Sequence, residues 1–333
     1  MLISIIIPVF DRRSTAWKAL ESALTQTLDR PQYEIVTVVG TSSDEDAHLP
    51  QLLQRCDTVV SIDADADSAA SEIHFYIAGQ RAAKGDVLFF VEGHTELLPE
   101  CCANIAAYFR AHPDSAVAWA PRINRNRTRL GAIIGQINLR AEAVAQSQGW
   151  FSLGANCVIT KSLFAALGGF DPRYFRGNEN ALFERIRQQR IPIGRIETPL
   201  VVHDNDMPRK LLIDSAFVAG AGKFNWCRSE QAAGNIDGPA SRRYRVYRHV
   251  SHPSTAWILD PAFRAFGHTT LFVATGVCRM NLALACALYV TAQRSFSASG
   301  FCRARRASAK RRAGVRWRRW AARVNAFLGS SGN

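Results

Sequence analysis

The chain has 333 residues, enough for one large domain or two modest ones, and its hydrophobic content of 47% is ordinary for a globular protein. The net charge of +13 is concentrated late in the chain. No Asp or Glu follows Asp260, whereas 13 of the 41 Lys and Arg residues do. The first 260 residues therefore hold 41 − 13 = 28 basic and 28 acidic residues and are neutral overall. The eight cysteines form no CxxC pair and no zinc-type spacing, which excludes a zinc cluster or a disulfide framework and favours reduced thiols in a cytosolic protein.

The first third of the chain alternates between strand-like and helix-like patterns. Apolar, β-branched runs predict strands at 2–9, 33–39, 58–62 and 87–91, with helices from Ser14 to about Leu28 and over 69–84. The N-terminal run lacks a basic leader, so we expect a first strand rather than a signal peptide. This alternation predicts an α/β fold with a mostly parallel sheet. The absence of GxGxxG after the first strand and of GxxxxGK[ST] excludes dehydrogenase-type and P-loop domains.

The rest of the body is less regular. We expect helices over 97–111, 161–167, 179–189 and about 209–217, strands over 116–123, 154–160 and 193–203, and irregular structure over 124–150.

The run Val87 to Val91 ends in Glu92-Gly93-His94, two potential metal ligands on either side of a glycine. Ligands of open α/β sheets bind beyond the carboxyl ends of the strands, which is where these side chains would lie. The alternative is an ordinary loop with two solvated side chains.

Several motifs in one order resemble the family 2 inverting glycosyltransferases of the GT-A fold, over roughly residues 2–225. They are Ile5-Ile6-Ile7-Pro8-Val9-Phe10-Asp11, Glu21-Ser22-Ala23-Leu24-Thr25-Gln26-Thr27-Leu28, Gly79-Gln80-Arg81-Ala82-Ala83-Lys84-Gly85, Phe89-Phe90-Val91-Glu92-Gly93-His94, Gly168-Gly169-Phe170-Asp171, Glu179 and Val201-Val202-His203. The resemblance implies a nucleotide-sugar half (1–123) and an acceptor half (124–225) of one GT-A-type domain with flanking helices.

The resemblance implies a divalent cation, Mn²⁺ or Mg²⁺, because the nucleoside diphosphate that leaves is highly charged. Glu92 and His94 stand where the family usually has Asp-X-Asp, and His203 matches its third metal-proximal group. An imidazole would suit Mn²⁺ better than Mg²⁺. The alternative for His203 is a histidine hydrogen-bonded beneath the sheet.

An inverting transfer also needs a carboxylate base. The family usually carries it on Glu-Asp at the start of a helix; here Glu179-Asn180 stands there, so Glu179 is the first candidate and Asp171 the second. Glu179 could instead be a first-turn acid that complements the helix dipole.

For the nucleotide, the resemblance assigns Pro8, Phe10 and Asp11 to the loop after the first strand. Val39-Gly40-Thr41 replaces the usual Asp-Asp-Gly after the second strand, and Ser42 or Asp44 could substitute. Arg81 could reach a phosphate or be a solvated helix residue.

Residues 226–265 are expected to be a linker and 266–333 a basic helical tail. Apolar residues 269–292 contain Arg279 and Asn281, so an interfacial helical pair is expected rather than a transmembrane span. The arginines after it alternate with Trp317 and Trp320, a composition that suits an anionic membrane surface. Nucleic-acid binding and a solvated tail are the alternatives, and no base-reading module accompanies the charge.

The sequence therefore predicts a glycosyltransferase located in the cytoplasm, peripheral to the inner face of the cell membrane. It would take a nucleotide-sugar donor and a glycan or glycolipid acceptor, with no specific nucleic acid as a partner. The competing predictions are a catalytically inactive protein of the same fold in a membrane-associated complex, and a polyanion binder acting through its tail.

Overall fold

The computed structural model describes residues 1–9, 15–40, 48–63, 72–147, 157–171, 178–232, 256–278, 281–299 and 302–303. The chain divides into two compact units, Met1–Leu212 with Ala274–Ala287, and Ile213–Val273 with Leu288–Asn333. The separation of catalytic domain, linker and tail expected from the sequence stays a prediction.

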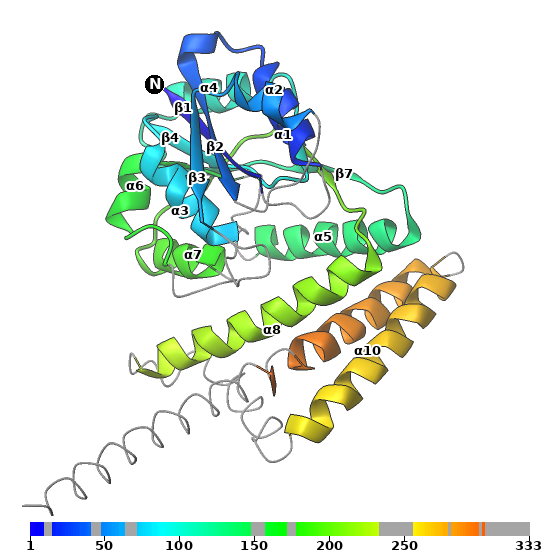
Figure 1. The fold of residues 1–333 in the computed structure, drawn as a ribbon. Helices are drawn as coiled ribbons and strands as arrows, with labels where there is room; N and C mark the ends of the chain where they lie inside the picture. The colour runs from blue at the N-terminus through cyan, green and yellow to red at the C-terminus, as the bar shows by residue number, and fades with distance from the viewer. Residues whose placement is uncertain are drawn as a thin grey trace, which may run out of the picture. The chain divides into compact units, whose positions relative to one another are not determined.

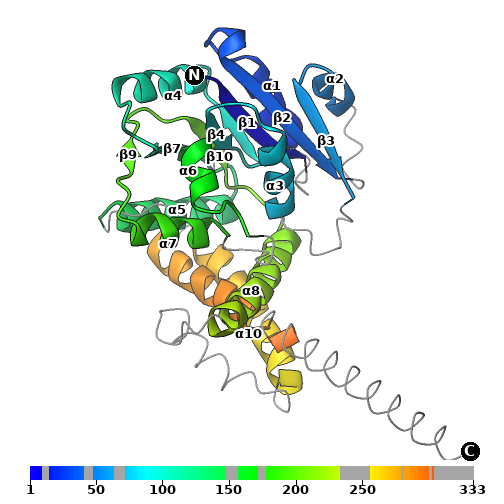
Figure 2. The same ribbon diagram turned by 90° about the vertical axis from the view of Figure 1, so that its left-hand side faces the viewer.

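A seven-stranded sheet forms the centre of the first unit, in the order β3-β2-β1-β4-β8-β6-β9 (Figures 1 and 2). Its strands are β1 (Ile3–Val9), β2 (Tyr33–Gly40), β3 (Thr58–Ile62), β4 (Val87–Phe90), β6 (Val117–Trp119), β8 (Cys157–Thr160) and β9 (Gly194–Arg195). The pairs β1–β2, β2–β3, β1–β4 and β6–β9 are parallel, and β8 is antiparallel to both of its neighbours. A second sheet has the order β5-β10-β7, formed by β5 (Thr95–Leu97), β7 (Arg122–Arg125) and β10 (Val201–Asp204).

Helices cover both faces of the large sheet because its strands are apolar on both sides. In β1, Ile5 and Ile7 share a core with α1 (Ala16–Leu24) and α4 (Cys101–Ala111). Ile6, which points the other way, shares a core with α3 (Glu72–Ala82), α6 (Lys161–Ala166) and α7 (Asn178–Gln188). The shorter helices are η1 (Arg30–Gln32) and α2 (Leu49–Leu53).

Prolines divide two of the expected strands between the sheets. Residues 116–123 form β6 and β7 rather than one strand, with Pro121 at the break, and residues 193–203 form β9 and β10, with Pro199 between them. Proline cannot donate to a strand ladder, so the chain leaves one sheet at these points and enters the other. The two crossings bring β7 and β10 together as parallel neighbours.

The expectation of irregular structure over 124–150 is wrong, because α5 (Arg129–Ser147) is a 19-residue helix. The hydroxyl of Thr128 accepts a hydrogen bond from the amide of Gly131 at 2.9 Å, which starts the helix. One face of α5 carries Gly131, Gly135 and Asn138, at i, i+4 and i+7, and another carries the apolar stripe Leu130, Ile133, Ile134 and Ile137, at i, i+3, i+4 and i+7.

The second unit is helical. It contains most of α8 (Arg209–Ala232), most of α10 (Ala256–Val277) and part of a helix over residues 282–299. The ring centroid of Phe296 lies 5.7 Å from that of Phe217 and 5.1 Å from that of His268. The expected tail beyond residue 303 lies outside the described residues, and among those that are described no helix is both long and apolar enough to span a bilayer.

Candidate metal and nucleotide site

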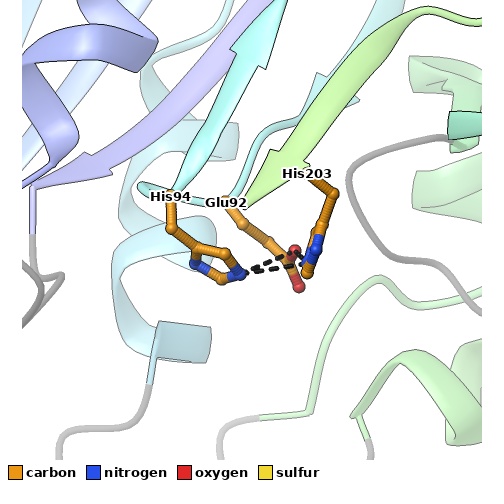
Figure 3. Close-up of side chains that lie close together, drawn as sticks. All are labelled: Glu92, His94 and His203. Carbon is orange, nitrogen blue, oxygen red and sulfur yellow. Dashed lines mark hydrogen bonds and ion pairs between the residues drawn. The ribbon is translucent and has the colours of Figure 1, made fainter. Parts of the chain in front are cut away.

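Three side chains from two strand ends converge at the carboxyl edge of β4 (Figure 3). Glu92 Oε2 lies 3.4 Å from His94 Nε2 and 3.2 Å from His203 Nε2, and the two imidazole nitrogens are 3.1 Å apart. Among the residues that the structure describes, Glu92, His94 and His203 are the one set of three or more potential ligands whose ligand atoms lie close enough together to hold a metal ion. Two imidazoles and a carboxylate thus share one small volume.

Backbone pairing fixes this convergence. The β4 strand ends at Phe90, and the chain turns at Gly93 and re-enters as β5, which pairs with β10 so that Thr95 is the register partner of His203. The amide of Asp204 donates to the carbonyl of His94 at 3.2 Å, which fastens the turn to β10. The ligand atoms are therefore held by strand register rather than by a long loop.

The site is mostly shielded from water, with the side chains of Glu92, His94 and His203 only 24%, 16% and 8% exposed. The Oε2 atom of Glu92 is buried and makes no hydrogen bond of ordinary geometry with the described residues. Burial raises the pKa of Glu92, but the neighbouring His94, His203 and Arg122 outweigh it and lower that pKa well below the usual range. The carboxylate is thus ionised and faces two nitrogen ligands, which is the donor set of a cation site.

A buried ion pair lies beside these ligands. Arg122 in β7 pairs with Glu142 in α5, and both side chains are largely shielded. Burial raises the pKa of Glu142, and the neighbouring Arg122 and His203 partly oppose that shift. The pair ties α5 to the strand beside β10.

Residues expected to bind the nucleotide follow β1 and β2. Pro8 ends up buried in β1, in register with Val38, whereas Phe10, Asp11 and Ser42 lie outside the described residues. Thr15, the first described residue after β1, lies beside the metal candidates, because its hydroxyl donates to the carbonyl of Gly93 at 3.3 Å.

The structure does not bring Arg81 to this edge. Arg81 is exposed in the last turn of α3, a crossover helix that leads back to the amino end of β4. Three residues later, the amides of Lys84 and Gly85 donate to Glu34 at the start of β2. Because the helix runs opposite to the strands, its last turn lies at the far edge from Glu92.

One of the two base candidates, Asp171, follows a residue that packs on β4. Asp171 is half-buried and directly follows Phe170, whose ring packs on Phe90 with centroids 5.0 Å apart. Glu179 is the second residue of α7, and its side chain lies outside the described residues. The helix is held to the preceding turn by Arg185, which donates to the carbonyl of Gly169 at 2.7 Å.

Reasoning from the sequence missed Asn205, Arg122 and Glu142. Asn205 stands in Asp204-Asn205-Asp206. Such a polar run at the end of a strand indicates a possible binding residue at the edge of the sheet. The pairing of Arg122 with Glu142 had no local signal, because it depends on α5.

No protein-family model matches the chain, and no curated protein matches its sequence. Solved structures do match. The mannosyltransferase PcManGT from Pyrobaculum calidifontis, in complex with GDP-Man and Mn²⁺, is 14% identical, with a TM-score of 0.53 over 89% of this chain and 85% of that one. S. aureus TarS 1–349 with UDP-GlcNAc is 12% identical, with a TM-score of 0.47 over 89% and 91%. Glucosyl-3-phosphoglycerate synthase from Mycobacterium tuberculosis, with Mn²⁺ and UDP, is 14% identical, with a TM-score of 0.45 over 66% and 77%.

The similarity to PcManGT concerns the fold. It confirms the expected α/β architecture, a GT-A-type mostly parallel sheet with flanking helices.

Proposed function

We propose that the chain is a glycosyltransferase that moves a sugar from a nucleotide-diphosphate donor to a hydroxyl of a lipid-linked or polysaccharide acceptor, with inversion. The observation that carries the proposal is the convergence of Glu92, His94 and His203 at the carboxyl edge of the sheet. A mannosyltransferase of the same fold was solved with GDP-Man and Mn²⁺. The resemblance of the sequence motifs to family 2 supports the same reaction.

Glu92, His94 and His203 would hold the divalent cation, and the buried, unsatisfied Oε2 of Glu92 fits that role. When bound, the cation offsets the negative charge that develops on the departing diphosphate. Two nitrogen ligands favour Mn²⁺ over Mg²⁺, which prefers oxygen.

Asp171 and Glu179 are the candidates for the base that takes the proton of the acceptor hydroxyl as it attacks the anomeric carbon. The edge-to-face contact of Phe170 with Phe90 holds the residue before Asp171 against β4, the strand that leads to Glu92. The amide of Asn180 cannot accept a proton at neutral pH, so the carboxylates carry this role.

The nucleotide would lie against Phe10, Asp11 and Ser42, which follow the parallel strands β1 and β2, whereas Pro8 is buried within β1. The hydrogen bond from Thr15 to Gly93 supports this placement, because it brings the end of the first loop to the metal candidates.

Calorimetry with a panel of nucleoside diphosphates, with and without Mn²⁺, tests the proposal on the wild type and on Glu92→Ala. We expect one nucleotide to bind in a metal-dependent way, and the variant to lose that dependence. Glu96→Ala is the matched control, because Glu96 is a nearby carboxylate that pairs with Arg125 instead. Failure of the folded wild type to bind any nucleotide would contradict the proposal.

Donor turnover separates this function from an inactive binding protein of the same fold. An inactive protein could bind the nucleotide that calorimetry identifies, but it would release none from the corresponding sugar donor. If replacing Glu179 abolishes product release and replacing Asp171 does not, Glu179 is the base.

We also propose that the protein associates with the anionic inner face of the cell membrane. The exposed residues of α10 include three large apolar side chains, Phe266, Phe272 and Val273, exposed by 53%, 70% and 41%. The chain from residue 261 onward contains basic residues and no acidic ones, which complements anionic lipid.

Sedimentation with vesicles of phosphatidylglycerol or phosphatidylcholine tests this association. We expect binding to the anionic vesicles only, weakened in Phe272→Ser and unchanged in Leu139→Ser, a control in α5 that is also an exposed apolar residue (46%). Tight binding to oligonucleotides with no binding to vesicles would favour the polyanion-binding alternative.

A further inference from the structure

The metal candidates combine one carboxylate with two imidazoles, and the distances between their ligand atoms bear on which cation fits. Glu92 Oε2 lies 3.4 Å from His94 Nε2 and 3.2 Å from His203 Nε2, and the two nitrogens are 3.1 Å apart. A tetrahedral zinc ion with bonds of about 2.0–2.1 Å separates neighbouring ligand atoms by about 3.3 Å. Octahedral Mg²⁺, with bonds of similar length, requires about 2.9 Å. Taken together, the three distances lie closer to the tetrahedral value.

Hydrogen bonds of the backbone fix the turn that carries Glu92 and His94. The carbonyl of Glu92 accepts from the amide and the hydroxyl of Thr95, at 3.0 and 2.7 Å. Thr95 is also the register partner of His203, and the carbonyl of His94 accepts from the amide of Asp204. Cation selectivity depends on the number, geometry and flexibility of the ligands, and these ligands have little freedom to rearrange.

The cluster contains three protein ligands. Among the described residues, no further Cys, His, Asp or Glu joins it. Asp204, next to His203 in β10, pairs instead with Arg127. The Nδ1 side of the His203 ring contacts the buried side chain of Asn205, so Nε2 is the nitrogen that faces the cluster. Two histidines and a glutamate with an open fourth position form the ligand set of a catalytic zinc site, whereas Mg²⁺ sites use oxygen.

We propose that this site selects a late first-row cation: it holds Zn²⁺ in a four-coordinate shell with one open position, binds Mn²⁺ more weakly and excludes Mg²⁺. The inference rests on the metal site of the proposed function and narrows the cation that it uses. His94 supplies a nitrogen where the family that the sequence resembles usually has the second aspartate of Asp-X-Asp. The open position would be available to an oxygen of the donor diphosphate.

Most nitrogen and oxygen sites bind Zn²⁺ more tightly than Mn²⁺, so that order alone is not diagnostic. The discriminating properties are the coordination number and the rejection of Mg²⁺. Both can be measured on the full-length, metal-free protein without any assay of transfer.

Cobalt absorption reports the coordination number, because four-coordinate Co²⁺ absorbs visible light far more strongly than six-coordinate Co²⁺. We expect one equivalent of Co²⁺ to give intense visible bands that Zn²⁺ abolishes, and we expect Glu92→Ala to lack them. Weak bands typical of six-coordination would overturn the inference. A near-ultraviolet band from cysteine thiolate would also overturn it, because the cation would then lie outside this cluster.

Competition against bound Mn²⁺, followed by electron paramagnetic resonance, measures selectivity. We expect Mg²⁺ to displace Mn²⁺ only at concentrations at least about 100-fold above those of Zn²⁺. His94→Asp exchanges a nitrogen ligand for a carboxylate, so Mg²⁺ should compete at least about tenfold better in this variant. His112→Ala, at an exposed histidine outside the site, is the matched control and should keep the wild-type order.

The outcomes separate this inference from the proposed function. If Mg²⁺ displaces Mn²⁺ as readily as Zn²⁺ does, or if His94→Asp leaves the selectivity unchanged, the inference is overturned while the metal site stays. A folded wild type that binds none of these cations would overturn the metal site itself. Selective binding of Zn²⁺ without binding of any nucleotide would support the inference and contradict the transferase.

Discussion

His94 Nε2 lies 3.1 Å from His203 Nε2, although 109 positions of sequence separate the two residues. His94 lies in the turn after β4, whereas His203 lies in β10 of the small sheet. The antiparallel pairing of β5 with β10 makes Thr95 the partner of His203, and this register places the two imidazoles side by side. The candidate metal site is therefore a product of how the two sheets connect.

Replacement of His203 by alanine should abolish Mn²⁺ binding. The variant lacks one of three ligand atoms, so we expect a larger loss than the roughly 10- to 100-fold that follows loss of an outer partner. Calorimetric titration of Mn²⁺ into the metal-free protein measures the effect. His112→Ala is the control, because His112 is an exposed histidine that contacts Tyr108, and unchanged binding in His203→Ala would remove this residue from the site.

The ion pair between Glu96 and Arg125 should stabilise the small sheet in a pH-dependent way. Arg125 hydrogen-bonds Glu96, with Nη2 donating to Oε2 at 2.8 Å, and lowers its pKa below the ordinary value of 4.5. A carboxyl whose pKa is lower when folded stabilises the fold above its unfolded pKa, and this stabilisation is lost as the pH falls through its folded pKa.

We therefore expect Glu96→Gln to lower the melting temperature at pH 7 and to match the wild type well below pH 4.5. Both side chains are about a third exposed, so the difference in unfolding free energy should be below about 1 kcal/mol. Thermal unfolding of both proteins across pH 2.5–8 measures it, and an equal deficit at every pH would show that the ion pair is not its cause.

Asp206→Ala should destabilise the start of α5. The Oδ1 atom of Asp206 accepts from the amide and hydroxyl of Thr128, at 2.9 and 2.6 Å, and Oδ2 accepts from the amide of Arg127 at 2.9 Å. Loss of these bonds should cost about 1–3 kcal/mol in denaturant unfolding. Asp114→Ala, at an exposed aspartate, should change stability by less than about 0.5 kcal/mol, and equal effects of the two variants would contradict this role.

Gly85→Ala should destabilise the turn that leads into β4. A Cβ atom there would lie 2.7 Å from the carbonyl oxygen of Leu2 and 2.8 Å from the amide nitrogen of Ser4, and backbone atoms of β1 and its approach cannot move aside cheaply. We expect a loss of about 1–3 kcal/mol in unfolding free energy. In Gly276→Ala, nothing lies within 4 Å of the new methyl group, so this helical control should be neutral or slightly stabilising.

The strand pattern alone was enough to find β1 to β4 and the polar residues at the end of β4. Unbroken apolar runs identify buried parallel strands, and Glu92-Gly93-His94 follows such a run directly. The α/β architecture followed from the alternation of these runs with helical patterns. These features are local, so they are visible in a single sequence.

The helix α5 was missed although Leu130, Ile133, Ile134 and Ile137 recur at the helical spacing of i, i+3, i+4 and i+7. Gly131, Gly135 and Asn138, on another face of the helix, pack against polar side chains and add no apolar signal of their own. By contrast, Pro121 and Pro199 stand in runs that read as continuous strands. Which sheet each piece joins depends on partners elsewhere in the chain.

The local strand pattern thus identified Glu92 and His94 as potential ligands, and the resemblance to a family motif added His203. Only the tertiary structure decided that Glu92, His94 and His203 meet and that Arg81 lies at the other edge of the sheet. The physical reason is that a ligand atom is placed by strand register and by a buried hydrogen-bond network, both of which join residues far apart in sequence.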